Sequence, residues 1–203
     1  MKSLSEIETV SKRSSRAAGY SWGIAEEVGK NIRLLEIFSL PGIKNLNNFF
    51  KYKKKLVLEN IKFINKDNEA KNSEYCPIII GINFLDQIRT LESLERINFK
   101  NMSFPLLFLP FVSRASEEIG KRIHLKIDDK EFLMNFNNNI YSNYLKDEII
   151  QSAKDIHVEI LENQDSFEEN EWKELYKLSE ETFVEENDSL KSSGAGAGLT
   201  DND

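Results

Sequence analysis

Two adjacent carboxylates, Glu26 and Glu27, are the residues of this sequence whose types and spacing could do chemistry. A buried carboxylate beside a cation such as Lys30 can act as a general acid or base, or hold an amine. Neighbours on a helix point about 100° apart, so one carboxylate would face a pocket and the other solvent. Glu26 and Lys30 also have the spacing of an ordinary surface ion pair, and this alternative stays open. The expected ligand-binding residues of the same stretch are Arg16, Ser21, Trp22 and Arg33.

Ser21 lies at the centre of a segment, Gly19–Gly23, that formally matches the Gly-x-Ser-x-Gly pattern of a nucleophile. That pattern requires a preceding strand, whereas the sequence before Gly19 predicts a helix. The two histidines, His124 and His157, fall on predicted strands far along the chain. We therefore expect Ser21 to cap a helix.

Two N-terminal helices must position these side chains. The first begins with a capping box, Ser3-x-x-Glu6, and Gly19 can end it in the left-handed conformation. Gly23 and Gly29 fall inside the second helix, where glycine costs about 1 kcal/mol relative to alanine. Their presence indicates close approach by another helix or by a ligand. The predicted buried stripe of the second helix is Ala25, Val28, Ile32 and Leu35.

The remaining periodicities predict an α+β (or mixed α/β) fold, in which the N-terminal helical pair packs on a mixed β-sheet with further short helices. The apolar run at 106–109, bracketed by Pro105 and Pro110, is expected to be the central strand. Further strands are predicted at 76–81, 97–99 (an edge strand), 123–127, 132–136 and 156–161, with a loop at 65–74. Further helices are predicted at 43–50, 84–94, 113–120, 143–153 and 166–181. A single domain at 1–186, helical over 1–50, then precedes a glycine-rich acidic tail at 187–203.

The tail contains Gly194-Ala195-Gly196-Ala197-Gly198, which lacks the Lys-Ser/Thr of a phosphate-binding loop. A segment without bulk can lie in a narrow groove of its own chain or a neighbour's, or it can be a disordered end. Both alternatives stay open. In the first, the tail completes the ligand pocket through Gly194, Gly196, Gly198, Asp201 and Asp203.

Composition excludes several classes of function. The net charge of −7 argues against nucleic-acid binding, and the longest apolar run is too short to cross a membrane. Two histidines and one cysteine at scattered positions give no metal-ligand spacing, and no motif identifies a cofactor. The single cysteine and the early acidic residue of the N-terminus predict a cytoplasmic protein without a signal peptide.

Charge is unevenly distributed along the chain. Residues 1–55 hold eleven cationic and five acidic side chains, whereas residues 161–203 hold three and thirteen. Opposite charges of this kind can attract each other within a chain or between subunits, or can be two solvated surfaces that never meet.

Four motifs together resemble an uncharacterised bacterial family of cytoplasmic proteins, a domain of unknown function. They are the Gly-x-Ser-Trp-Gly-x-Ala-Glu-Glu-x-Gly helix at 19–29, Cys76-Pro77, the Leu-Leu-x-Leu-Pro-Phe run at 106–111, and the Gly-Ala-Gly-Ala-Gly-Leu-Thr-Asp-Asn-Asp end at 194–203. The resemblance implies that the tail is a purposeful terminus, and it implies no reaction.

Two functional hypotheses follow. In the first, the protein binds a small anionic or amino-acid-like metabolite in a pocket lined by the second helix and completed by the tail, and any base would be Glu26 or Glu27. In the second, it is a non-catalytic accessory subunit of a metabolic enzyme, or a homo-oligomer assembled through its C-terminus.

Overall fold

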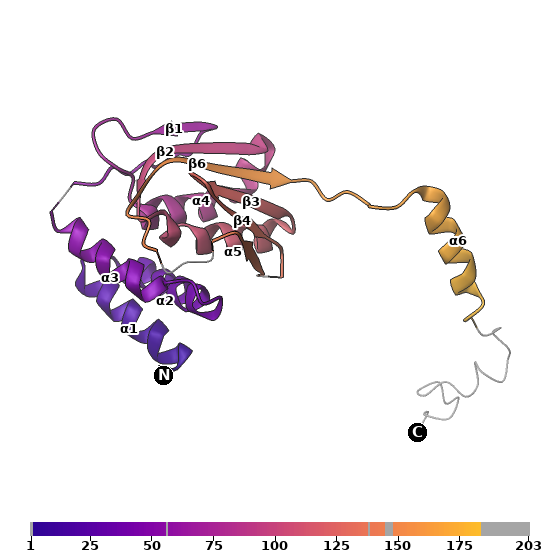
Figure 1. The fold of residues 1–203 in the computed structure, drawn as a ribbon, viewed down its shortest axis with the longest axis horizontal. Helices are drawn as coiled ribbons and strands as arrows, with labels where there is room; N and C mark the ends of the chain where they lie inside the picture. The colour runs from indigo at the N-terminus through magenta and orange to yellow at the C-terminus, as the bar shows by residue number, and fades with distance from the viewer. Residues whose placement is uncertain (1, 56, 138, 145–147, 184–203) are drawn as a thin grey trace, which may run out of the picture. The chain divides into compact units, whose positions relative to one another are not determined.

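The computed structural model describes residues 2–55, 57–137, 139–144 and 148–183. The fold is α+β, as predicted: these residues form six α-helices and a six-stranded mixed sheet (Figure 1). The chain divides into two compact units, residues 1–163 and 164–203, and each is described by itself. The domain limit expected at residue 186 stays a prediction.

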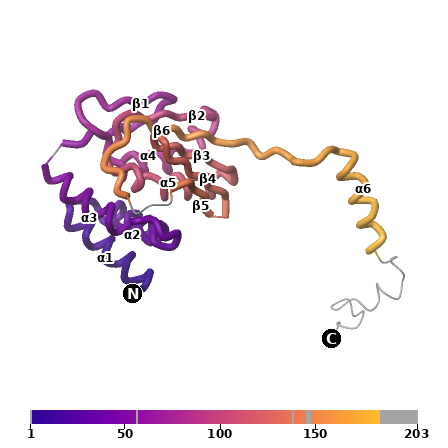
Figure 2. The backbone as a smooth tube through the Cα atoms, viewed as in Figure 1, coloured from indigo at the N-terminus to yellow at the C-terminus, as the bar shows by residue number. Residues whose placement is uncertain are grey.

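The first unit begins with three helices, α1 (Leu4–Ala17), α2 (Trp22–Ile37) and α3 (Gly42–Lys53), which lie side by side (Figure 2). The expected start and stop signals are all used. Ser3 and Glu6 form the capping box of α1, Gly19 has a φ of 96°, and the Ser21 hydroxyl accepts the Ile24 N–H. Beyond this bundle, α2 packs against α5 (Leu109–Ile119), and α3 packs against a short 3₁₀ turn, η2 (Pro105–Leu107).

The sheet has the strand order β1-β2-β6-β3-β4-β5, in which only the β1–β2 pair is parallel. The strands predicted at 123–127, 132–136 and 156–161 are confirmed as β3, β4 and β6. The residues at 97–99 form part of β2, but β2 is not an edge strand because β1 pairs outside it. The strands are β1 (Asp67–Glu69), β2 (Arg96–Ser103), β3 (Arg122–Ile127), β4 (Lys130–Met134), β5 (Ile140–Ser142) and β6 (Ser152–Leu161).

The strand β1 lies in a stretch predicted to be a loop. Its sequence is polar, so it carries no apolar signal for a strand. The buried Asn68 side chain holds it instead, by donating to the carbonyls of Asn65 and Asn98 at 2.7 and 3.0 Å. Hydrogen bonding therefore replaces apolar packing at this edge.

Three further predictions of secondary structure are wrong. Residues 76–81 begin helix α4 (Pro77–Leu91), and 106–109 form η2 (Pro105–Leu107) and the start of α5 (Leu109–Ile119). Both segments are buried on several sides, so they lack the polar face by which a helix is recognised. The described residues of 143–153 contain no helix, and β6 begins within them. A second 3₁₀ turn, η1 (Glu92–Leu94), follows α4.

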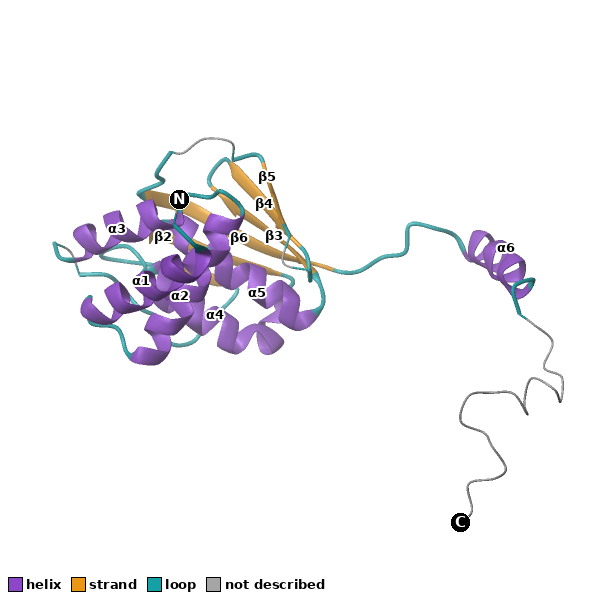
Figure 3. Cartoon of the chain, turned by 90° about the horizontal axis from the view of Figure 1, so that it is seen from below, coloured by secondary structure: helices purple, strands orange, loops and turns teal. Residues whose placement is uncertain are grey.

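The helices α4 and α5 cover one face of the sheet (Figure 3). Three phenylalanines join these layers: Phe108 lies 5.4 Å from Phe84 of α4 and 5.6 Å from Phe99 of β2, between ring centroids. On the opposite face of β2, β3 and β6, alternate side chains are half-buried or exposed. The sheet thus has one apolar face and one open polar face.

The second unit contains α6 (Glu169–Glu180), which confirms the helix expected at 166–181. Glu168 and Glu171 form its capping box, and none of its residues is buried. Within this unit, its apolar side chains therefore do not pack in a core.

Candidate functional site

Helix α2 presents four of the predicted site residues, Trp22, Glu26, Glu27 and Arg33. Its expected stripe is buried, and Gly29 allows α1 to approach closely: a Cβ there would lie 2.8 Å from the Glu8 carbonyl oxygen. At Gly23 a Cβ would meet nothing within 4 Å. The close approach predicted from the two glycines is therefore found at Gly29, where α1 is the neighbour, and not at Gly23.

Glu26 and Glu27 are both held in ion pairs. Glu26 lies 2.9 Å from Lys12 of α1 and 3.3 Å from Lys30, while Glu27 lies 3.1 Å from Lys30 and also contacts Arg114 of α5. These carboxylates therefore connect α2 to the helices on either side of it.

The ion pairs determine how the two carboxylates titrate. Hydrogen bonds from Lys12 and then Lys30 lower the pKa of Glu26. Partial burial raises the pKa of Glu27, but the hydrogen bonds from Arg114 and Lys30 outweigh it, and the net pKa is lowered. A general base at neutral pH is favoured by a pKa near 7. The geometry thus favours carboxylates that stay ionised and fix cations, although the predicted role as a base stays a prediction.

The other predicted binding residues fall in two separate places. Arg16 donates to the Tyr20 carbonyl at 3.0 Å and lies 5.5 Å from the Trp22 ring centroid, at the turn between α1 and α2. Ser21 lies at the same turn, where it lines a cavity of about 350 Å³ together with Lys53 and Cys76. Ser21 and Arg33, which were predicted to line one pocket, therefore line two different cavities.

Arg33 belongs to the second place, a groove of about 350 Å³ between α2 and α5. Its guanidinium lies 3.1 Å from Glu8 and its side chain is 49% exposed, so it remains accessible from the groove. The groove is lined by Lys30, Arg33, Leu34 and Ile37 from α2 and by Arg114 and Glu117 from α5.

Sequence analysis missed both Arg114 and Glu117 as site residues. The two are three residues apart, so they share a face of α5. The available sequence signal for this pair was its Arg-x-x-Glu spacing on a helix whose first turn is apolar. That this face of α5 points toward α2 depends on tertiary packing, which the spacing does not reveal.

The remaining predicted site residues, Gly194, Gly196, Gly198, Asp201 and Asp203, lie outside the described residues. Within the described ranges no three His, Cys, Asp or Glu side chains are grouped so as to hold a metal ion. Across the same ranges, every helix falls short of the length and apolarity that a membrane span requires.

Comparison with known families gives a match over the N-terminal part of the chain. Residues 2–75 match the family model described as Protein of unknown function (DUF3726), which confirms the resemblance to an uncharacterised domain family over that part of the chain. The match includes the helix motif at 19–29 and ends before Cys76. No curated protein and no solved structure matches the chain.

Proposed function

We propose that this protein binds a small amino-acid-like zwitterion in the groove between α2 and α5. The observation that carries the proposal is the composition of that groove, in which three cations and one carboxylate border an apolar surface made by Leu34 and Ile37. A ligand with a carboxylate, an amine and an aliphatic side chain matches all three kinds of surface.

The cations of the groove are suited to a ligand carboxylate. Arg114 and Lys30 are held by Glu27, and Arg33 is held by Glu8, so their positions are fixed before a ligand arrives. A guanidinium has five N–H donors in a planar fork. Arg114 can therefore keep its contact with Glu27 and still donate to a second carboxylate.

Glu117 is suited to a ligand amine. It is exposed at the rim of the groove, and it forms no ion pair with another side chain among the described residues.

In this proposal Glu26 and Glu27 position the cations. The predicted contribution of the tail lies outside the described residues. We propose that the protein is cytoplasmic, and a free and buried Cys76 supports this location.

Titration calorimetry with three matched ligands tests the proposal. Leucine has both charged groups, leucinamide lacks the carboxylate, and 4-methylpentanoate lacks the amine. Because a hydrogen bond to a charged group contributes about 1.5–3 kcal/mol, we expect leucine to bind about tenfold or more tightly than either analogue. Arg114→Gln should remove the preference over leucinamide, and Glu117→Gln should remove the preference over 4-methylpentanoate.

Arg89→Gln is the matched control, since Arg89 pairs with Glu118 on the surface outside the groove at 3.0 Å. It should leave both preferences intact. Equal affinity for the three ligands, or the same loss in Arg89→Gln as in Arg114→Gln, would show that the groove does not select a zwitterion.

A second candidate function is a homo-oligomer or accessory subunit, and the exposed apolar face of α6 favours it. Trp172, Leu175 and Tyr176 are 51–66% exposed. A helix of 12 residues is marginal alone in water, so packing against another surface would stabilise it. We infer that a second copy of this chain supplies that surface, because the basic N-terminal and acidic C-terminal regions have complementary charges.

Sedimentation velocity at several salt concentrations tests this assembly. Screening lengths fall from about 10 Å at 0.1 M salt to about 3 Å at 1 M, so a dimer held by these charges should dissociate as salt rises. Leu175→Ser should be monomeric at low salt, whereas Lys177→Ser, which changes the other side of α6, should still dimerise. A monomeric wild-type chain at every salt and protein concentration would refute the dimer.

A further inference from the structure

We infer that the open face of the sheet carries a second ligand site, independent of the α2–α5 groove, for an organic anion with an apolar body. The inference begins with strand alternation. Ile123, Leu125 and Ile127 of β3 are buried beneath the helices, so His124 and Lys126 point to the opposite face.

Neighbouring strands repeat this alternation. In β6 the buried Ile156, Val158 and Ile160 alternate with His157 and Glu159. Both histidines of the chain therefore lie on the open face. Histidines on adjacent strands of one face, surrounded by charged side chains, form a polar surface that the fold does not need for its core.

The register of the strands arranges these residues in rows that run across the sheet. One row consists of Arg96, Glu159, His124, Leu133 and Tyr141, each opposite the next. Strands lie about 4.8 Å apart, so His124 and Tyr141 are roughly 10 Å apart across the sheet. The row is charged on β2 and β6 and apolar on β4 and β5, which is the polarity of an anionic head joined to an apolar body.

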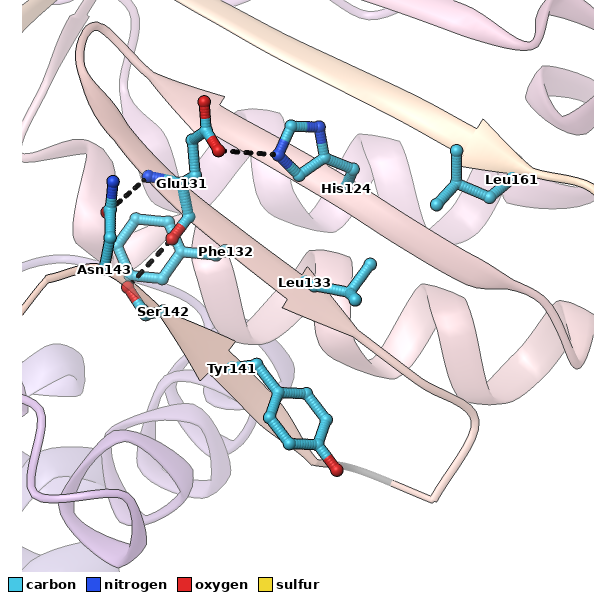
Figure 4. A pocket seen from close by; sticks show the side chains of 8 residues that line it. All are labelled: His124, Glu131, Phe132, Leu133, Tyr141, Ser142, Asn143 and Leu161. Atoms are coloured by element: carbon cyan, nitrogen blue, oxygen red, sulfur yellow. Dashed lines mark hydrogen bonds and ion pairs between the residues drawn. The ribbon is translucent and has the colours of Figure 1, made fainter.

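Two cavities lie along this face and share His124. One, of about 250 Å³, is lined by Arg96, His124, Lys126, His157 and Glu159. The other, of about 470 Å³, is shown in Figure 4, where Leu133, Leu161 and Tyr141 provide its apolar part. Because they share a residue, a single ligand can extend from the charged cavity into the apolar one.

Hydrogen bonds fix the orientation of His157. Its Nδ1 lies 2.7 Å from Oδ1 of Asn98, whose Nδ2 donates to Asp67 at 2.6 Å. With the amide N–H₂ directed at Asp67, the Asn98 oxygen accepts, so His157 Nδ1 carries the proton. The other ring nitrogen, Nε2, forms no hydrogen bond among the described residues and is left for a ligand.

The cations of the charged cavity differ in their availability. Arg96 donates to Glu159 at 2.8 Å. Lys126 lies 3.7 Å from Glu131, beyond hydrogen-bond distance, and His124 lies 3.8 Å from the same carboxyl (Figure 4). Lys126 therefore keeps donors for an anion. The head group that suits it is a carboxylate or a phosphate monoester, and the apolar body rests on Leu133 and Tyr141.

Histidine ring resonances give a direct test, because the chain has two histidines and both are in the site. We would titrate the full-length protein, labelled at histidine, with 3-phenylpropionate and with phenyl phosphate. Both histidine signals should shift and saturate with each probe. The neutral alcohol 3-phenylpropanol and the short anion propionate should bind about tenfold or more weakly, since each lacks half of the recognised chemistry. Whichever anion binds more tightly identifies the head group.

Variants separate this site from general electrostatic attraction. Lys126→Gln should weaken binding of both probes about tenfold. Lys100→Gln removes an exposed lysine from strand β2, outside both cavities, and should leave binding unchanged. Arg114→Gln should also leave it unchanged, so the outcome does not depend on the α2–α5 groove. Histidine signals that stay fixed at millimolar probe, or equal losses in Lys126→Gln and Lys100→Gln, would overturn the inference.

Discussion

Phe108→Ala is expected to lower the free energy of unfolding by about 3–5 kcal/mol, the range for a large aromatic removed from a core. Phe108 is fully buried, and its ring makes edge-on contacts with Phe84 and Phe99. One truncation therefore removes contacts with helix α4 and strand β2 at once. For a domain of this length, the melting temperature should fall by roughly 6–20 °C in calorimetry.

The control is Phe136→Ala, because Phe136 is 48% exposed. It should change the unfolding free energy by less than about 0.5 kcal/mol. If the two variants melt at similar temperatures, Phe108 does not join the helices to the sheet.

Helix ends were the part of the fold most readily predicted from sequence. Ser3, Gly19 and Ser21 each act locally, through a hydrogen bond within three residues or a left-handed φ. Such signals do not depend on the rest of the molecule. The alternation in β3, β4 and β6 was equally readable, because one face of those strands is polar and the other apolar.

The two apolar runs could not be assigned from periodicity. A helix buried on several sides and a buried strand both read as continuous apolar sequence, and prolines flank both. Pro77 and Pro110 stand in the first turns of α4 and α5, where a missing N–H costs nothing. Proline at a helix start was therefore the better interpretation. Because residues 106–109 belong to η2 and α5, they are not in the sheet, and its central strands are β6 and β3.

The candidate sites show the same division between local and distant signals. The pair Glu26–Lys30 follows from helical spacing alone, and the structure contains it. The contact of Glu27 with Arg114 joins residues 87 positions apart, so no local pattern encodes it. The row from Arg96 to Tyr141 likewise depends on the register of five strands. A prediction that took residues 106–109 as the central strand could not give that register.

Gly81→Ala shows how strongly the packing of α4 on α5 restricts the sequence. A Cβ at Gly81 would lie 2.1 Å from Cδ2 of Phe111, a buried ring on α5 that has no space to withdraw. Alanine is the better helix former by about 1 kcal/mol, so an unobstructed site would be stabilised. Here we expect the overlap to dominate, with a net loss of about 1–3 kcal/mol in the free energy of unfolding by urea denaturation.

Two further variants test whether the overlap with Phe111 is the reason that Gly81→Ala lowers the free energy of unfolding. Gly23→Ala places the same methyl group in a helix where nothing lies within 4 Å, and it should raise the free energy of unfolding by up to about 1 kcal/mol. Adding Phe111→Leu to Gly81→Ala removes ring atoms from the overlap. The double variant should therefore lose less stability than the sum of its two single changes. Additive losses, or stabilisation by Gly81→Ala alone, would show that α5 does not approach α4 as closely as the structure places it.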